Sequence, residues 1–234
     1  SLAVMRAWER RPRKDRLVWV GCNLRFHPGV IRLKEAIGQG LIGKPRIFRI
    51  HFSHYLPNMR PGKDYRLTYA ASAEQGGGII LDDIHDIDLA LWLAGPVKQI
   101  SGVAVNSGAL DIEVEDIASI ALVHDSGVFS EIHMDYLRQD KSRGIEVIGE
   151  KGTLEWRSRG KNPEQAALEL FQPGKPALSI WREEIANFRG MFSQQLGQIL
   201  KSLSEPEAGK QRLEEAIAAI RIVQQVKEKY LCQT

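Results

Sequence analysis

The sequence predicts an α+β fold in which an open, mostly antiparallel sheet packs on helices. Three observations lead to this class. β-type runs follow one another between residues 97 and 181, helical patterns stand before and after them, and turn signals separate the runs. Hydrophobic residues make up 43% and charged residues 26% of the 234 residues. That balance is typical of a globular protein with one substantial core.

The N-terminal part of the chain contains two predicted helices and two β-type segments. Residues 2–11 favour a short helix that ends before a proline, and residues 17–20 form a short β-rich run. Pro28 starts a second helix, whose apolar residues recur at helical spacing until glycines end it. Residues 45–55 alternate polar and apolar side chains, as a half-buried strand does.

A loop, a glycine-led helix and a block of strands come next. Residues 56–75 are polar and lack periodicity, and a loop of this length usually carries function. The triple glycine at 76–78 leads into a helix that runs to about residue 93. Strands are expected at 97–106, 116–124, 128–136, 144–149 and 152–157, with weaker ones at 166–171 and 177–181, and helices at about 183–203 and 208–230 close the chain.

Composition and patterning exclude several classes of protein. The net charge is only +3, and the basic segment at residues 6–16 is interpreted as a solvated helix end because Trp8 is its only aromatic residue; we expect no nucleic-acid partner. No apolar run approaches the ~20 residues that span a bilayer, and the start of the chain lacks a signal pattern, so we expect a cytoplasmic protein without a membrane partner. Cys22 and Cys232 form neither a disulfide framework nor a zinc-ligand spacing.

One glycine-rich stretch imitates two nucleotide-binding motifs. Gly38, Gly40 and Gly43 match G-x-G-x-x-G, and Lys44 extends the match to G-x-x-x-x-G-K. A dinucleotide fingerprint needs a strand before the glycines and a helix after them, whereas the predicted order here is the reverse. Pro45 occupies the place of the magnesium-binding Ser or Thr. We therefore expect these glycines to end a helix.

The residues best suited to chemistry follow the triple glycine. On a single helix, Asp82, His85 and Asp88 fall at i, i+3 and i+6, so that Asp82 reaches His85 from the preceding turn. Asp83 and Asp86 are expected to point elsewhere, Asp83 into solvent. Histidine moves protons near neutral pH, and nearby carboxylates orient it and tune its pKa. The pattern predicts a functional role for His85, the alternative being a structural histidine.

Further residues are candidates for substrate binding. The triple glycine permits close approach of a ligand, a tight turn being the alternative. A segment after the first β-type run and the loop at 56–75 supply arginine, histidine and tyrosine donors, which suit a hydroxyl-rich or anionic substrate. The predicted substrate-binding residues are Arg25, His27, Arg60, Tyr65, Arg66, Gly77, Gly78 and Asp88.

His51 and His54 also raise the alternative of a metal site with the nearby aspartates. Three positions apart on a strand, the two side chains leave from opposite faces of the sheet, which argues against joint ligation. The sequence therefore predicts no metal ligands.

Taken together, these motifs resemble the Gfo/Idh/MocA oxidoreductases. The resemblance covers roughly residues 17–157 well and the final helices loosely. It rests on the triple glycine with Asp82, His85 and Asp88, and on Trp92-Leu93-Ala94-Gly95, Val20 to Pro28, Gly40 to Lys44, Tyr55-Leu56-Pro57, Asp64-Tyr65-Arg66, Asp116 and Gly149 to Thr153.

The resemblance implies an architecture and an activity. Members of that family pair an N-terminal NAD(P)-binding Rossmann domain with a C-terminal α/β domain whose exposed sheet face often makes a dimer. They act on sugars, sugar nucleotides and polyols by hydride transfer. By resemblance, residues 1–22 are the remnant of the dinucleotide-binding domain and residues 23–234 the substrate and oligomerisation domain, with His85 as the proton-transfer residue and Asp82 in support. A homo-oligomer with a carbohydrate-like substrate is implied.

Two departures from the family pattern shape the functional prediction. The E-K-P motif, its lysine and the strand-glycine-helix unit are absent, and Asp82 stands three rather than four residues before His85. NAD or NADP is therefore expected only in the complete enzyme, with no cofactor-binding residues in this chain and no activity from the chain alone. Two alternatives stay open, which are a non-catalytic carbohydrate-binding or assembly module and a metal-dependent hydrolase.

Overall fold

The computed structural model describes residues 17–160, 165–183, 188–204 and 206–233, with isolated positions before residue 17. The strands in these residues are β1 (Pro45–Tyr55), β2 (Val97–Asn106), β3 (Ile117–His124), β4 (Phe129–Asp135), β5 (Leu137–Gly149), β6 (Thr153–Arg159), β7 (Gln165–Phe171), β8 (Leu178–Glu183) and β9 (Leu231–Gln233). The helices are α2 (Pro28–Gly38), α3 (Ile79–Asp82), α4 (His85–Ala94), α5 (Phe188–Lys201) and α6 (Pro206–Tyr230). Short 3₁₀ turns are η1 (Asn23–Phe26), η2 (Leu56–Asn58), η3 (Tyr65–Leu67), η4 (Tyr69–Ala71) and η5 (Ser202–Ser204).

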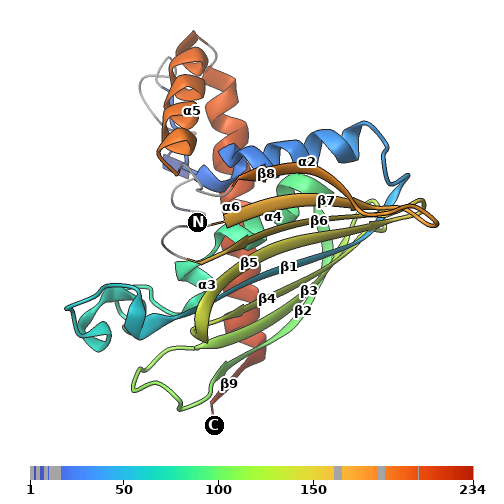
Figure 1. Cartoon of the computed structure of the whole chain (residues 1–234). Helices are drawn as coiled ribbons and strands as arrows, with labels where there is room; N and C mark the ends of the chain where they lie inside the picture. Colours follow the sequence, from blue (N-terminus) through green and yellow to red (C-terminus); the bar gives the residue numbers. More distant parts are fainter. Residues whose placement is uncertain are drawn as a thin grey trace.

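Within the described residues, the strands form one sheet in the order β8-β7-β6-β5-β1-β4-β3-β2-β9. Neighbouring strands run antiparallel except for the pairs β1–β4 and β2–β9, which are parallel. Helices α2, α4 and α6 lie along one face of the curved sheet, and α5 stands beyond its edge beside the first half of α6 (Figure 1). This arrangement confirms the predicted α+β class with an open, mostly antiparallel sheet.

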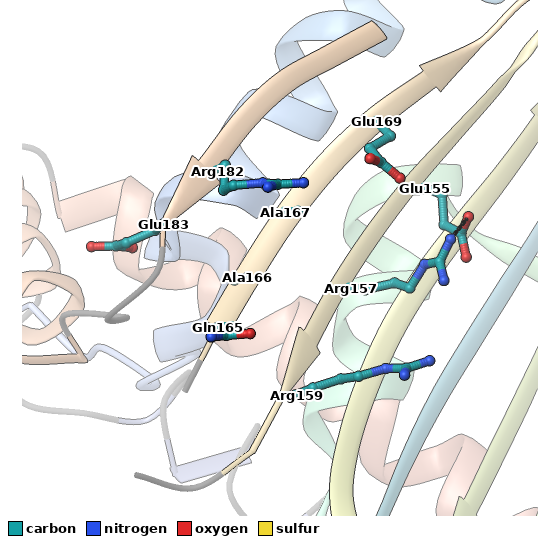
Figure 2. A pocket seen from close by; sticks show the side chains of 9 residues that line it. All are labelled: Glu155, Arg157, Arg159, Gln165, Ala166, Ala167, Glu169, Arg182 and Glu183. Atoms are coloured by element: carbon teal, nitrogen blue, oxygen red, sulfur yellow. Dashed lines mark hydrogen bonds and ion pairs between the residues drawn. The ribbon is translucent and has the colours of Figure 1, made fainter. Parts of the chain in front are cut away.

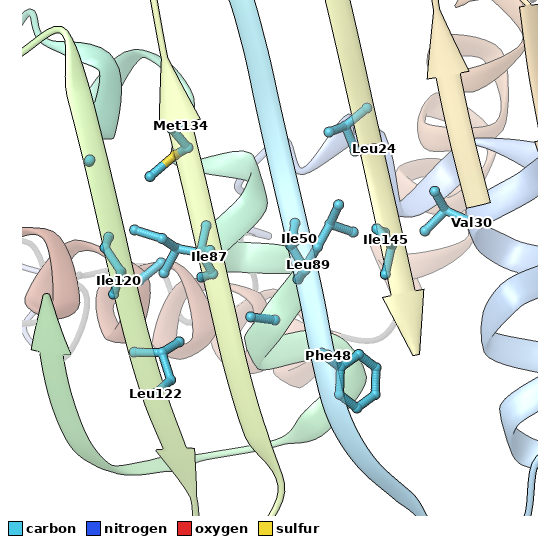
Figure 3. Close-up of a cluster of buried hydrophobic side chains, with 14 of the residues drawn as sticks. Leu24, Val30, Phe48, Ile50, Ile87, Leu89, Ile120, Leu122, Met134 and Ile145 are labelled. Atoms are coloured by element: carbon cyan, nitrogen blue, oxygen red, sulfur yellow. The ribbon is translucent and has the colours of Figure 1, made fainter. Parts of the chain in front are cut away.

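The two faces of the sheet differ in burial, as the alternating pattern of its strands requires. On the inner face, Phe48 and Ile50 of β1 are 1% and 2% exposed and belong to one hydrophobic core with Ile87 and Leu89 of α4. Figure 3 shows these α4 side chains lying against the strands. On the outer face, Arg49 bonds to carboxylates of both neighbouring strands, at 3.0 and 3.1 Å.

Most predicted elements are confirmed, and the differences lie where strands or helices meet other parts of the fold. Residues 17–20 form no strand, the strand predicted at 144–149 begins at Leu137 as β5, and the short β9 was not predicted. The helix predicted at 2–11 and the basic segment at 6–16, which overlaps it, lie largely outside the described residues. None of the helices in the described part of the chain combines the length and the apolarity that crossing a membrane requires.

Candidate active site

The segment after the triple glycine forms two helices, so the prediction of one continuous helix is wrong. α3 ends at Asp82 because Asp83 leaves the helical conformation, with φ −118° and ψ 41°. α4 then begins at His85. The spacing i, i+3, i+6 therefore does not hold across this break, and His85 lies in the first turn of a new helix.

Asp82 is bound by two tyrosines. Its carboxylate accepts hydrogen bonds from the hydroxyl of Tyr69 and, at 3.0 Å, from that of Tyr136. The hydrogen bond to this carboxylate raises the pKa of Tyr69 to about 12, so the phenol stays protonated and donates. No hydrogen bond joins Asp82 to His85 in the described residues, which corrects the expectation that Asp82 reaches the imidazole directly.

His85 is partly exposed and its ring makes no hydrogen bond within the described part of the chain. Burial is the main cause that lowers the pKa of His85, and the cation of Arg143 acts in the same direction. Asp83, Asp88 and Asp82 oppose that shift. The imidazole is therefore neutral near pH 7 and has a nitrogen available to accept a proton.

Asp83 and Asp86 are buried in the protein interior, so the expectation that Asp83 faces solvent is wrong. Their exposed fractions are 4% and 0%. Arg143 of β5 donates to both carboxylate oxygens of Asp83, and its Nε lies 3.5 Å from Oδ1 of Asp86. The guanidinium also lies 3.8 Å from the ring centroid of Phe52. Burial raises the pKa of Asp86.

His54 adds a second buried imidazole to this region, and the two β1 histidines face opposite ways. His54 is 3% exposed, its ring lies 5.1 Å from that of Tyr136, and its Nδ1 has no hydrogen-bond partner among the described residues. His51 lies on the outer face, 3.1 Å from Oγ of Ser142. In the part of the chain that the structure describes, no three His, Cys, Asp or Glu side chains gather as metal ligands.

Arg25 and Asp88 form an internal ion pair. They are 3% and 4% exposed, and Arg25 donates to both oxygens of Asp88, at 2.8 and 2.5 Å. Arg25 also bonds to Glu215 of α6, and the Cys22 thiol lies 3.3 Å from Asp88. These contacts tie η1, α4 and α6 together. A substrate-binding role for Arg25 and Asp88 stays a prediction, and their polar atoms are engaged with each other.

His27 is also buried, with 2% of its surface exposed. Its Nδ1 accepts the backbone N–H of Gly29 at 3.1 Å and so caps α2. The ring meets Trp156 and Trp181 edge to face, with centroids 5.0 and 5.7 Å apart. Burial lowers the pKa of His27 to about 4. The structure therefore gives His27 a capping role, and its predicted contact with substrate is untested.

The loop at 56–75 reaches Asp82 and leaves a small hollow of about 20 Å³ beside it. The residues that line this hollow are Leu56, Met59, Arg60, Tyr65, Thr68, Tyr69, Ala70 and Asp82. The guanidinium of Arg60 lies 5.1 Å from the ring centroid of Tyr69. Arg66, in contrast, forms exposed ion pairs with Asp64 and Asp111, at 2.7 and 3.3 Å. The structure thus brings Arg60 and Tyr65 to the carboxylate and not Arg66.

The glycines approach other parts of the protein closely. A Cβ on Gly77 would lie 2.4 Å from the carbonyl oxygen of Tyr69. Gly78 has φ +97°, and a Cβ there would lie 2.3 Å from Oε1 of the buried Glu115. Lys227 of α6 pairs with Glu115 at 3.0 Å and donates to the carbonyl of Gly77 at 3.2 Å. The tight turn explains both glycines, and ligand contact with them stays a prediction.

Four residues of this region were missed as site residues by the sequence analysis. Tyr69 stands in the loop that its length marks as functional. His54 stands near the end of β1, Tyr136 lies between β4 and β5, and Arg143 lies within β5. A polar residue in one strand gives no signal of what faces it. A buried arginine in β5, opposite the acidic run of α3 and α4, needs the pairing of distant elements to be recognised.

The comparisons with known proteins agree with this architecture. Residues 30–155 match the family model described as the GFO/IDH/MocA C-terminal domain. The chain is 32% identical over 161 residues to myo-inositol 2-dehydrogenase of Thermotoga maritima, covering 64% of this chain and 44% of that protein. It is 32% identical over 124 residues to 1,5-anhydro-D-fructose reductase of Ensifer adhaerens, covering 52% of this chain and 36% of that protein. The chain thus spans less than half the length of these relatives.

Solved structures show the same fold at low identity. KijD10, a 3-ketoreductase from Actinomadura kijaniata in complex with NADP and TDP-benzene, has a TM-score of 0.76 and 18% identity, with 100% of this chain and 67% of that chain covered. An inositol dehydrogenase homolog from Azotobacter vinelandii complexed with NAD⁺ has a TM-score of 0.69 and 17% identity, with coverages of 91% and 62%.

Because the family model matches more than half of the residues and these structures share the fold, the chain belongs to the GFO/IDH/MocA oxidoreductase family and contains its C-terminal domain.

Proposed function

We propose that residues 23–234 are the substrate and oligomerisation domain of an NAD(P)-dependent oxidoreductase acting on a sugar, sugar nucleotide or polyol, and that residues 1–22 end its dinucleotide-binding domain. The observation that carries the proposal is the state of His85. Its imidazole is partly exposed, unbonded within the described residues and lowered in pKa. The relatives that are named as dehydrogenases and reductases of inositol and anhydrofructose support the substrate class.

In this proposal His85 is the general base. Oxidation of an alcohol to a carbonyl releases the hydroxyl proton, and the neutral imidazole accepts it; in the reverse direction the imidazolium returns it. Asp82 acts through its tyrosines, since it holds Tyr69 beside the hollow that Arg60 also lines. The guanidinium is a donor suited to hydroxyl oxygens, and the phenol oxygen of Tyr69, whose proton is donated to Asp82, can accept a hydrogen bond.

The glycine-rich stretch at residues 38–43 does not fit a dinucleotide. Gly40 and Gly43 have φ of +72° and +68°, but they stand after α2 and before β1, so no helix N-terminus faces them. We therefore propose that NAD or NADP is held outside this chain, and the residues described here are assigned only the handling of substrate and proton.

The experiment that tests this function combines binding and turnover. We expect myo-inositol, added to the isotope-labelled chain, to shift the NMR signals of His85 and Tyr69, while absorbance at 340 nm shows no reduction of NAD⁺ or NADP⁺. A longer protein from the same gene that includes a dinucleotide-binding unit is expected to reduce one of them. Reduction of NAD⁺ or NADP⁺ by the 234-residue chain alone would refute the proposal that the cofactor is held outside this chain. If no polyol or sugar of a panel changed the signals of His85, the proposed substrate site would be refuted.

We also propose that the outer face of the sheet pairs with a second copy. In the described part of the chain, helices cover the other face (Figure 1). The central outer face holds a hollow of about 570 Å³, and Val103 in it is 40% exposed. A charged hollow of about 340 Å³ follows on β6–β8, where Figure 2 shows Arg157, Arg159 and Arg182. An interface with an apolar centre and a charged rim is the usual pattern.

The mass of the chain in solution tests this pairing. Light scattering after size exclusion is expected to give a dimer, and Val103→Asp is expected to give a monomer because it places an unpaired charge in the apolar hollow of the interface. Leu67, which is 85% exposed in the loop at 56–75, provides the matched control: Leu67→Asp should leave the dimer intact. A monomeric wild-type chain at tens of micromolar would contradict the proposal.

A further inference from the structure

Among the described residues, Arg143 of β5 acts on His85 and on the acidic residues next to it, and it belongs to the sheet rather than to the helices. Its side chain is 10% exposed. One nitrogen, Nη2, donates to both oxygens of Asp83, while Nε lies 3.5 Å from Asp86 and the guanidinium plane covers Phe52. In the described part of the chain both carboxylate oxygens of Asp86 are buried without a hydrogen bond, and Arg143 is its ion-pair partner. Arg143 therefore holds two buried carboxylates at once.

The position of Asp83 gives this contact a geometric consequence. Asp83 is the residue whose backbone ends α3, and α4 begins two residues later. The hydrogen bonds from β5 tie that residue to the sheet, 60 positions away in sequence. Because His85 is in the first turn of α4, the direction of its side chain follows from how Asp83 is held.

The same contact has an electrostatic consequence. The charged groups that act on His85 are Asp83, Arg143, Asp88 and Asp82. Asp88 is already paired with Arg25, and Asp82 is bound by its two tyrosines. Arg143 is the cation that compensates Asp83, and an uncompensated buried carboxylate two residues before His85 would favour the protonated imidazole.

We propose that Arg143 is a positioning residue for His85: by gripping Asp83 at the break between α3 and α4 and lying beside Asp86, it fixes the start of α4 and keeps the imidazole in its proton-accepting form. This role rests on the proposed function of His85. In this proposal Arg143, a strand residue outside the glycine-led helix motif, controls the protonation of His85.

The test follows the His85 imidazole by NMR in the labelled 234-residue chain while the pH is varied, with His85→Gln used to assign the signal. Arg143→Met is expected to move the His85 midpoint to higher pH, because the cation is removed and Asp83 is left. Asp83→Asn, a nearly isosteric change, is expected to move it to lower pH. The double variant is expected to return towards the wild-type midpoint and to regain thermal stability lost in Arg143→Met. Arg138→Met is the matched control, since Arg138 is in the same strand but pairs with the exposed Asp140.

Shifts of opposite sign would support the proposal, because general loosening of the structure would move the midpoint in one direction for both variants. Equal-sign shifts, or shifts no larger than that of the Arg138 control, would overturn it. If Arg143→Met does not fold, Asp83→Asn decides alone, and an unmoved midpoint there counts against the proposal. Since no turnover is measured, failure of the Arg143 role and failure of the dehydrogenase function are separate results.

Discussion

Replacing His85 by glutamine is expected to lower the turnover of the complete enzyme by roughly 10²–10⁴-fold, the range in which a positioned general base contributes. Glutamine keeps much of the size and the hydrogen-bonding capacity of the side chain but does not accept a proton. Because His85 opens α4 at a partly exposed position, the substitution disturbs little of the core. The loss is expected in kcat rather than in KM, since the proton moves only as the alcohol is oxidised.

The pH dependence of the same reaction provides a second readout. Burial lowers the pKa of His85 below its ordinary value of 6.5. Oxidation needs the neutral form, so kcat/KM is expected to fall as the pH drops through the His85 pKa and to be level above it. In His85→Gln this acid limb should disappear. His133→Gln, on the exposed outer face of β4, is the control that should retain both rate and limb. A His85→Gln enzyme with wild-type kcat would exclude the assignment of the base.

Acidification is expected to destabilise the folded chain by up to about 3 kcal/mol through His27 alone. Its pKa is about 4 in the folded protein, compared with a usual value of 6.5, and each unit of difference corresponds to about 1.4 kcal/mol. Below pH 6.5 His27 is protonated in the unfolded chain but stays neutral in the folded chain. The contribution of His27 to the free energy of unfolding is therefore fully present above that pH and is lost as the pH falls towards 4. Protonation of Nδ1 would also remove the acceptor for Gly29.

Urea unfolding at a series of pH values between 4 and 7 measures this effect. Burial also lowers the pKa of His54, His85 and His124, so the slope of stability against pH should exceed that of one proton. In His27→Asn the cap is retained, because asparagine is a preferred N-cap residue, and the His27 contribution to the slope should vanish. An unchanged slope would show that His27 is not responsible.

The elements of the sheet were predictable because their signal is local. β2 has the predicted bounds, and β3 and β4 differ from prediction by one residue at their ends. A strand with one buried face alternates with period two whatever its neighbours are. Pro28 likewise starts α2 where it was expected, since proline suits the first turn of a helix. The order of the strands in the sheet, with β1 between β4 and β5, was not predictable, because no local sequence pattern specifies it.

The candidate site, too, was predictable where its signal is local and not where it depends on contacts between distant residues. The sequence alone predicts that His85 takes part in proton transfer. A histidine, four aspartates and three glycines stand in one short segment, so this prediction needs no knowledge of distant contacts. Which carboxylate meets which partner was decided by contacts across the fold: Tyr136 reaches Asp82 over 54 positions and Arg25 reaches Asp88 over 63.

Those long-range contacts changed the local structure as well. The apolar, helix-compatible run after the triple glycine predicts one helix, yet Asp83 leaves it and is buried against a guanidinium from β5. Burial of an ion pair depends on a partner that comes close only after the sheet and helices have packed. The sequence by itself therefore determined the family and the class of fold and predicted His85 as the base, whereas the tertiary structure decided where the helix breaks and which charges surround that residue.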